Sequence, residues 1–127
     1  MRIEPFSKLD DVSLSANRDE LSRLLGAPVN NNVNRLGLDE FDYGGRVFRF
    51  EPSGCLSEVT IEAERVEFGQ VSVPFTALSD FISSNDSDSF ERYGFIVSPA
   101  YGIAFDPEHH PWVTVLTRGG LDGWKKL

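Results

Sequence analysis

Cysteine is almost absent from this chain of 127 residues, which contains only Cys55. A single cysteine forms no intrachain disulfide, and a reducing cytoplasm is the simplest compartment for such a protein. Basic residues are also scarce, because 12 Lys and Arg stand against 20 Asp and Glu, for a net charge of −8. No Lys/Arg cluster is present that would neutralise phosphates. The composition therefore argues against direct binding to nucleic acid or to anionic membranes.

Long apolar runs are missing as well. No segment approaches the roughly 18–20 apolar residues of a membrane-spanning helix. The start of the chain, residues 1–6, mixes polar and apolar residues without the pattern of a signal peptide. We therefore expect a cytoplasmic protein. Hydrophobic residues nevertheless make up 40% of the chain, which is enough for a real core and predicts a single domain over residues 1–127.

The residues that usually carry catalysis or bind metals are few and poorly spaced. Both histidines, His109 and His110, fall in one proline-flanked turn, and adjacent side chains of an extended chain point to opposite faces. The acidic stretch 85–88 lacks the glycine and the terminal glutamate of a calcium loop. A lone thiol needs a positioned base to act as a nucleophile, so we interpret Cys55 as a small turn or strand residue. No phosphate-binding glycine loop or nucleophile elbow is present. We predict no metal, no cofactor and no enzymatic activity.

Two helices are indicated by their apolar spacing. Asn17 and Glu20 fit the N-x-x-E form of a capping box. The segment 21–25 then places leucines at i, i+3 and i+4, and Gly26 suits the helix end. A second helix is predicted over residues 75–82, where Pro74 or Phe75 opens a similar apolar face.

Alternating polar and apolar residues predict strands in most of the remaining chain. Residues 46–50 and 56–63 form a predicted antiparallel hairpin around a turn at 52–54. Further strands are expected at 66–73, with a bend at Gly69, and at 93–98, 101–105 and 112–116. The asparagine-rich stretch 29–38 is interpreted as a loop, and Gly119-Gly120 is expected to end the last strand.

The two halves of the chain resemble each other weakly. Val12-Ser13-Leu14 precedes the first helix as Val71-Ser72-Val73 precedes the second, and Val59-Thr60-Ile61 is echoed by Val113-Thr114-Val115. The predicted fold class is α+β, with an antiparallel sheet and two helices packed on one face. The echo favours two pseudo-repeated α-β-β units within that sheet.

The acidic excess is concentrated in two segments. Residues 39–67 carry eight acidic and three basic groups, and residues 80–108 carry six acidic and one basic. Such segments form either a solvated strand face or a surface that attracts a basic partner. On the second interpretation the first candidate partner-binding patch is Asp39, Glu40, Asp42, Glu62, Glu64 and Glu67. The second candidate patch is Asp86, Asp88 and Glu91.

A family resemblance is carried mainly by residues 12–28, where a short strand and a helix end in Leu24-Leu25-Gly26-x-Pro28. This pattern resembles the N-terminal region of bacterial immunity proteins from contact-dependent inhibition and polymorphic-toxin systems. The resemblance extends loosely over most of the chain, through Asp42-Tyr43, the hairpin 46–61 and residues 101–106 with Trp112. That family typically has Gly-Met or a similar pair before the helix, where this chain has Ser15-Ala16. The segment is also similar to small outer-membrane assembly lipoproteins, whose signal peptide and lipidated cysteine have no counterpart here.

The resemblance implies a protein that binds and blocks one cognate toxin, often a nuclease. The expected partner is a basic C-terminal nuclease domain, to which an acidic surface is complementary. Specificity residues vary within such families, so no individual site residue is carried over. Two alternatives remain. One is a non-catalytic scaffold or assembly module of another bacterial complex. The other is a small enzyme or ligand carrier, which requires a deep pocket lined by Phe and Tyr with converging carboxylates.

Overall fold

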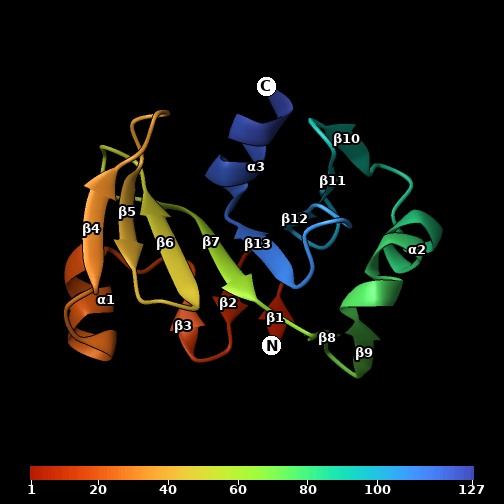
Figure 1. Cartoon of the computed structure of the whole chain (residues 1–127), viewed down its shortest axis with the longest axis horizontal. Coiled ribbons are helices and arrows are strands. Elements are labelled where there is room, and N and C mark those ends of the chain that lie inside the picture. The colour runs from red at the N-terminus through yellow and green to blue at the C-terminus, as the bar shows by residue number, and fades with distance from the viewer.

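The computed structural model describes every residue from Met1 to Leu127, and its largest element is an eight-stranded antiparallel sheet (Figure 1). The strand order is β10-β11-β12-β13-β7-β6-β5-β4. The strands are β4 (Asn30–Val33), β5 (Asp39–Asp42), β6 (Arg46–Phe50), β7 (Leu56–Glu62), β10 (Phe90–Arg92), β11 (Phe95–Ser98), β12 (Ile103–Phe105) and β13 (Trp112–Leu116). The predicted α+β class with an antiparallel sheet is confirmed.

Two smaller sheets and three helices surround the large sheet. One small sheet consists of β1 (Ile3–Glu4), β2 (Lys8–Leu9) and β3 (Val12–Ser13), and the other pairs β8 (Arg65–Phe68) with β9 (Val71–Pro74). The helices are α1 (Arg18–Leu25), α2 (Phe75–Asn85) and α3 (Arg118–Lys125). In Figure 1, α1 lies at the β4 end of the molecule, α2 at the β10 end, and α3 between them.

The large sheet is built from two equivalent halves. Helix α1 precedes the meander β4–β7, helix α2 precedes the meander β10–β13, and the two meanders join where β13 pairs with β7. Thr60 and Thr114 lie opposite each other at the centre of this pair, with their hydroxyl oxygens 2.9 Å apart. Each half therefore contains four sheet strands rather than the two that the α-β-β prediction assigned.

Part of this difference comes from β4, because the loop predicted at residues 29–38 is a strand at Asn30–Val33, whereas residues 34–38 form a turn as expected. Asn30 pairs with Asp42 and Val33 pairs with Asp39, so this stretch is a hairpin with β5. The side chain of Asn34 closes the turn by accepting hydrogen bonds from the amides of Leu36 and Leu38. Asparagine is a poor strand former, and pairing with the neighbouring strand overrides that preference here.

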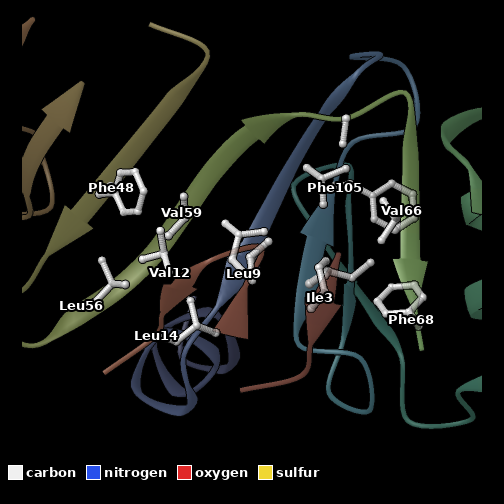
Figure 2. Packing of buried hydrophobic residues seen from close by; sticks show 14 of the residues in the cluster. Ile3, Leu9, Val12, Leu14, Phe48, Leu56, Val59, Val66, Phe68 and Phe105 are labelled. Atoms are coloured by element: carbon white, nitrogen blue, oxygen red, sulfur yellow. The ribbon is translucent and has the colours of Figure 1, made fainter. Parts of the chain in front are cut away.

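The main core lies on the sheet face covered by α1 and α2. Leu21 of α1 and Leu78 of α2 belong to the same buried cluster as Val59 and Val113 of the two central strands. Figure 2 shows side chains of the N-terminal sheet and of β7 and β8 filling this layer, with Leu9 and Val12 between β2–β3 and β7. The expectation that these two helices pack on one face of the sheet agrees with this arrangement.

The N-terminus of α1 follows the predicted capping box. The side-chain oxygen of Asn17 accepts a hydrogen bond from the Glu20 amide at 2.9 Å, and the Glu20 carboxylate accepts one from the Asn17 amide at 3.4 Å. Gly26 then ends the helix with a positive φ of 82°. The cap and the glycine together fix where α1 starts and stops.

Helix α3 was missed by the sequence analysis, and it packs on the opposite face of the sheet, against β7 and β13. Thr117 caps it by accepting a hydrogen bond from the Gly120 amide, while its hydroxyl donates to the Ser57 carbonyl at 2.9 Å. A Cβ on Gly120 would overlap that same carbonyl oxygen. Gly120, which was expected to end the last strand, instead permits close contact between the helix and β7.

The contact between Gly120 and β7 can be tested by substitution, with Gly123 of the same helix as the control. We expect Gly120→Ala to lower the free energy of unfolding by about 1–3 kcal/mol, because the added methyl must displace the backbone of β7. Gly123→Ala meets nothing within 4 Å, so we expect it to be neutral or to stabilise by up to about 1 kcal/mol through helix propensity. Urea denaturation of both variants measures the difference. Equal stabilities would contradict this account of Gly120.

Candidate functional site: a groove beside helix α3

The sheet face that carries α3 is divided into a covered half and an open half. Over the β11–β13 half, Val97, Ala104 and Leu116 pack against Leu121 of α3 in a second, smaller core cluster. Over the β4–β7 half no helix is present, and the side chains of these strands that share the α3 face are polar except for Val47. The border between the two halves is a groove.

The groove has a volume of about 980 Å³. Its floor is formed by alternate residues of β5, β6, β7 and β13, and its walls come from the β4–β5 turn, the segment 106–110 and α3. Apolar groups include the indole rings of Trp112 and Trp124 and the side chain of Leu36. The acidic lining residues, Glu40, Glu51, Glu58, Asp106 and Glu108, outnumber the basic Arg49 and Lys126.

An ion-pair cluster occupies the floor, and we call Glu40, Arg49 and Glu58 the Arg49 cluster. The Nε atom of Arg49 donates to Glu40 at 2.7 Å, and its Nη1 atom donates to Glu58 at 2.9 Å. All three side chains are only 15–21% exposed. Because one guanidinium faces two carboxylates, the cluster carries an excess negative charge that solvent screens only partly.

The second oxygen of each carboxylate in the cluster is also engaged. Glu40 accepts a hydrogen bond from the side-chain amide of Asn32 at 3.1 Å, and Glu58 accepts one from the indole N–H of Trp124 at 3.2 Å. The Glu58–Trp124 bond ties α3 to β7. Both carboxylates are thus fixed as acceptors of surrounding donors.

The structure divides the first predicted acidic patch. Glu40, Asp42 and Glu62 share the groove face, as the alternation of β5 and β7 requires. Asp39 lies on the other face and pairs with Arg18 at 2.8 Å. The remaining two residues lie beyond the end of β7, where Glu64 pairs with His110 and Glu67 pairs with Arg2. The six residues therefore do not form one continuous surface.

The second predicted patch contains one residue that is not at the surface. Asp86 is buried, and its carboxylate accepts hydrogen bonds from the Ser98 hydroxyl and from the amides of Ala100 and Asp88. Burial raises the pKa of Asp86, but these hydrogen bonds outweigh it and leave the pKa below its ordinary value. Asp86 therefore organises the turn after α2, whereas Asp88 and Glu91 are exposed.

Most of the residues that define the groove were not predicted from the sequence. Arg49 and Glu58 occupy the polar positions of the predicted hairpin, so their alternation with apolar residues could have placed them on one open face. Nothing in the sequence indicated that Trp124 returns from the C-terminal helix to this face. The two histidines bond to separate carboxylates, and no group of three or more potential ligands is arranged to hold a metal ion.

Comparison of the chain with known protein families, curated proteins and solved structures finds no match. None of the three helices combines the length and the apolar character needed to cross a membrane. The geometry of the groove and the resemblance carried by residues 12–28 are therefore the features that bear on function.

Asp86 gives a prediction with a defined pH dependence. We expect Asp86→Asn to lower the free energy of unfolding at neutral pH by about 1.5–3 kcal/mol, because its amide group would face hydrogen-bond donors. The folded pKa of Asp86 is lowered, so its stabilising contribution is complete above the unfolded carboxyl pKa of about 3.9 and is lost as the pH falls through the folded pKa. The difference in the free energy of unfolding between the wild type and Asp86→Asn should narrow only below about pH 4.

Asp88→Asn is the matched control, because this neighbouring carboxylate is exposed and accepts no hydrogen bond. Chemical denaturation across the acidic range measures all three proteins. A stability loss in Asp86→Asn that does not change with pH would contradict the assigned role of the carboxylate.

Proposed function

We propose that this chain is a cytoplasmic immunity protein that binds and neutralises a cognate toxin through the groove beside α3. The observation that carries the proposal is the Arg49 cluster, in which two half-buried carboxylates share one guanidinium on the floor of an open groove. The resemblance of residues 12–28 to immunity proteins supports the same function. The proposal replaces the two separate acidic patches with one surface that contains Glu40, Glu62 and Glu108.

The chemistry of the groove suits a partner that presents lysine or arginine side chains. An incoming cation would meet incompletely neutralised carboxylates, and the indole faces of Trp112 and Trp124 offer cation–π contacts. A nuclease binds phosphates with a basic surface. An acidic groove is therefore complementary to the surface by which such a toxin would bind its substrate.

A catalytic role is less well supported by the same residues. The groove is lined by Trp and by Phe95 rather than by the Phe and Tyr that a ligand-binding pocket was expected to have. The carboxylates of the Arg49 cluster are engaged with nearby donors. We therefore propose that the protein acts by binding alone.

The proposal predicts that exposed acidic residues of the groove face control binding. Glu62 and Glu108 are exposed and form no ion pair within the chain. Reversal of their charge should therefore leave the fold intact. We expect Glu62→Lys combined with Glu108→Lys to weaken capture of the partner about tenfold or more at low ionic strength. The control is Glu4→Lys combined with Asp11→Lys, which makes the same charge change at exposed positions of the N-terminal sheet.

The experiment uses the purified chain as bait in a lysate of its native strain and identifies captured proteins by mass spectrometry. The captured protein is then expressed alone, with the wild-type chain, and with each double variant. Growth arrest that the wild type and the control relieve, but the groove variant does not, is the expected result. Capture of a non-toxic assembly would instead favour the scaffold alternative, and equal binding by both double variants would reject the groove as the binding surface.

A further inference from the structure

The large sheet ends in two edge strands that differ in their protection. The β10 edge is three residues long and carries Glu91 and Arg92, and charges on short edges discourage pairing with other chains. The β4 edge contains only asparagines and Val33, and every residue of β4 is exposed. Val29, just before β4, and Val33, its last residue, are 75% and 66% exposed. The β4 edge therefore has none of the charges that usually prevent edge-to-edge association.

The backbone of β4 offers hydrogen-bonding groups at its centre. The Asn34 amide donates to the Leu38 carbonyl at 2.9 Å, in the same register that pairs Asn32 with Glu40. In an antiparallel ladder the paired and unpaired positions alternate, so the amide and carbonyl of Asn31 point away from β5. The amide of Val33 points the same way. These groups form an open template for one more strand.

The sequence of this edge reads the same in both directions around Asn31, as Val29-Asn30-Asn31-Asn32-Val33. If a two-fold axis passes through this strand at Asn31, Asn31 lies opposite Asn31 of the second copy, and Val29 lies opposite Val33 of that copy. Val33 lies two residues from Asn31 in the same strand, so the Val33 side chains of both copies lie on one face of the sheet. The amide of Val29 donates to the Asp42 carbonyl at 2.7 Å, which leaves the Val29 carbonyl for the second copy. The same axis aligns about four outward backbone hydrogen bonds between the two copies.

The local charge at this edge allows a second copy to approach, in contrast to most of the protein surface. Two chains of net charge −8 repel each other, and most acidic surfaces of this protein would bring carboxylates together. No carboxylate lies in the paired segment. The nearest ones are on β5, where Asp39 and Glu40 are each paired with an arginine. Asp42, opposite Asn30, has no arginine partner and accepts a hydrogen bond from the Gly44 amide. The β4 edge is thus a surface on which self-association meets little local repulsion.

We propose that two copies of this chain associate by antiparallel pairing of their β4 strands around a two-fold axis at Asn31. The resulting sheet is continuous through both copies, and the axis is perpendicular to it, so both grooves open on the same side. Pairing of one short strand buries less than the roughly 1,200–2,000 Å² of a typical stable complex. We therefore expect a weak dimer whose population rises with protein concentration.

Sedimentation velocity of the full-length chain over a wide range of concentrations tests the proposal without any toxin present. We expect a concentration-dependent dimer for the wild type and only monomer for Asn31→Pro, which removes an outward amide and leaves the pairing with β5 intact. Val33→Lys should also abolish the dimer, because it adds a like charge at each end of the paired segment. Val71→Lys is the control, since Val71 is an exposed valine of β9.

A crosslinking experiment tests the position of the axis. In a Cys55→Ser background, Asn31→Cys should form an intermolecular disulfide on mild oxidation, because the two-fold axis brings the two Cα atoms to about 5.5 Å. Asn30→Cys should crosslink poorly, since its side chain lies on the other face and faces Asn32 of the second copy. Circular dichroism of each variant checks that the fold is retained.

Each outcome decides the proposal. A wild-type chain that stays monomeric at all concentrations overturns it, as does a dimer that folded Asn31→Pro and Val33→Lys both retain. Crosslinking of Asn30→Cys in preference to Asn31→Cys would reject the axis at Asn31. The dimer and the toxin-binding function are independent, because these measurements do not involve the groove or its partner.

Discussion

The antiparallel pairing of β7 with β13 is the interaction on which the rest of the structure depends. It joins two meanders that are distant in sequence, with the two threonine hydroxyls at its centre 2.9 Å apart. The joined strands carry apolar residues on one face, where α1, α2 and the N-terminal sheet complete the core. On the other face, where α3 docks and the groove begins, Glu58, Thr60 and Thr114 are polar and Leu116 packs against α3. A change in the register of this pair by one residue would exchange the two faces.

The groove exists because helix α3 packs on a sheet face that would otherwise be open to solvent. Without it, Arg49, Glu40 and Glu58 would form a cross-strand ion-pair row of modest energy. When α3 is in place, Trp124 donates a hydrogen bond to Glu58, and the helix forms one side of the groove beside the Arg49 cluster. Charged groups and aromatic rings therefore line the same concave surface. The close approach depends on Gly120, which allows the helix backbone to contact the Ser57 carbonyl. The proposed binding function and the packing of the C-terminus are therefore linked.

Local patterns predicted those parts of the fold that are set by neighbouring residues. The capping box at Asn17 and Glu20, the helix that begins at Phe75 and the β6–β7 hairpin all formed as expected, because spacing along the chain determines them. The strand β4 and the helix α3 were not predicted. Their residues, asparagines and glycines, have weak intrinsic preferences, and long-range contacts with β5 and β7 stabilise them instead.

In the candidate site too, some features follow from the sequence alone and others depend on long-range contacts. The sequence by itself determined an acidic, cysteine-poor chain with its negative charge concentrated around two hairpins, because charge and composition do not depend on folding. Only the tertiary structure decided which carboxylates act together. Asp86 and Asp88 are two residues apart, yet one is buried within hydrogen bonds and the other is exposed. Glu40 and Glu58 are 18 residues apart, yet they hold the same guanidinium, because strand register and not sequence distance brings side chains together.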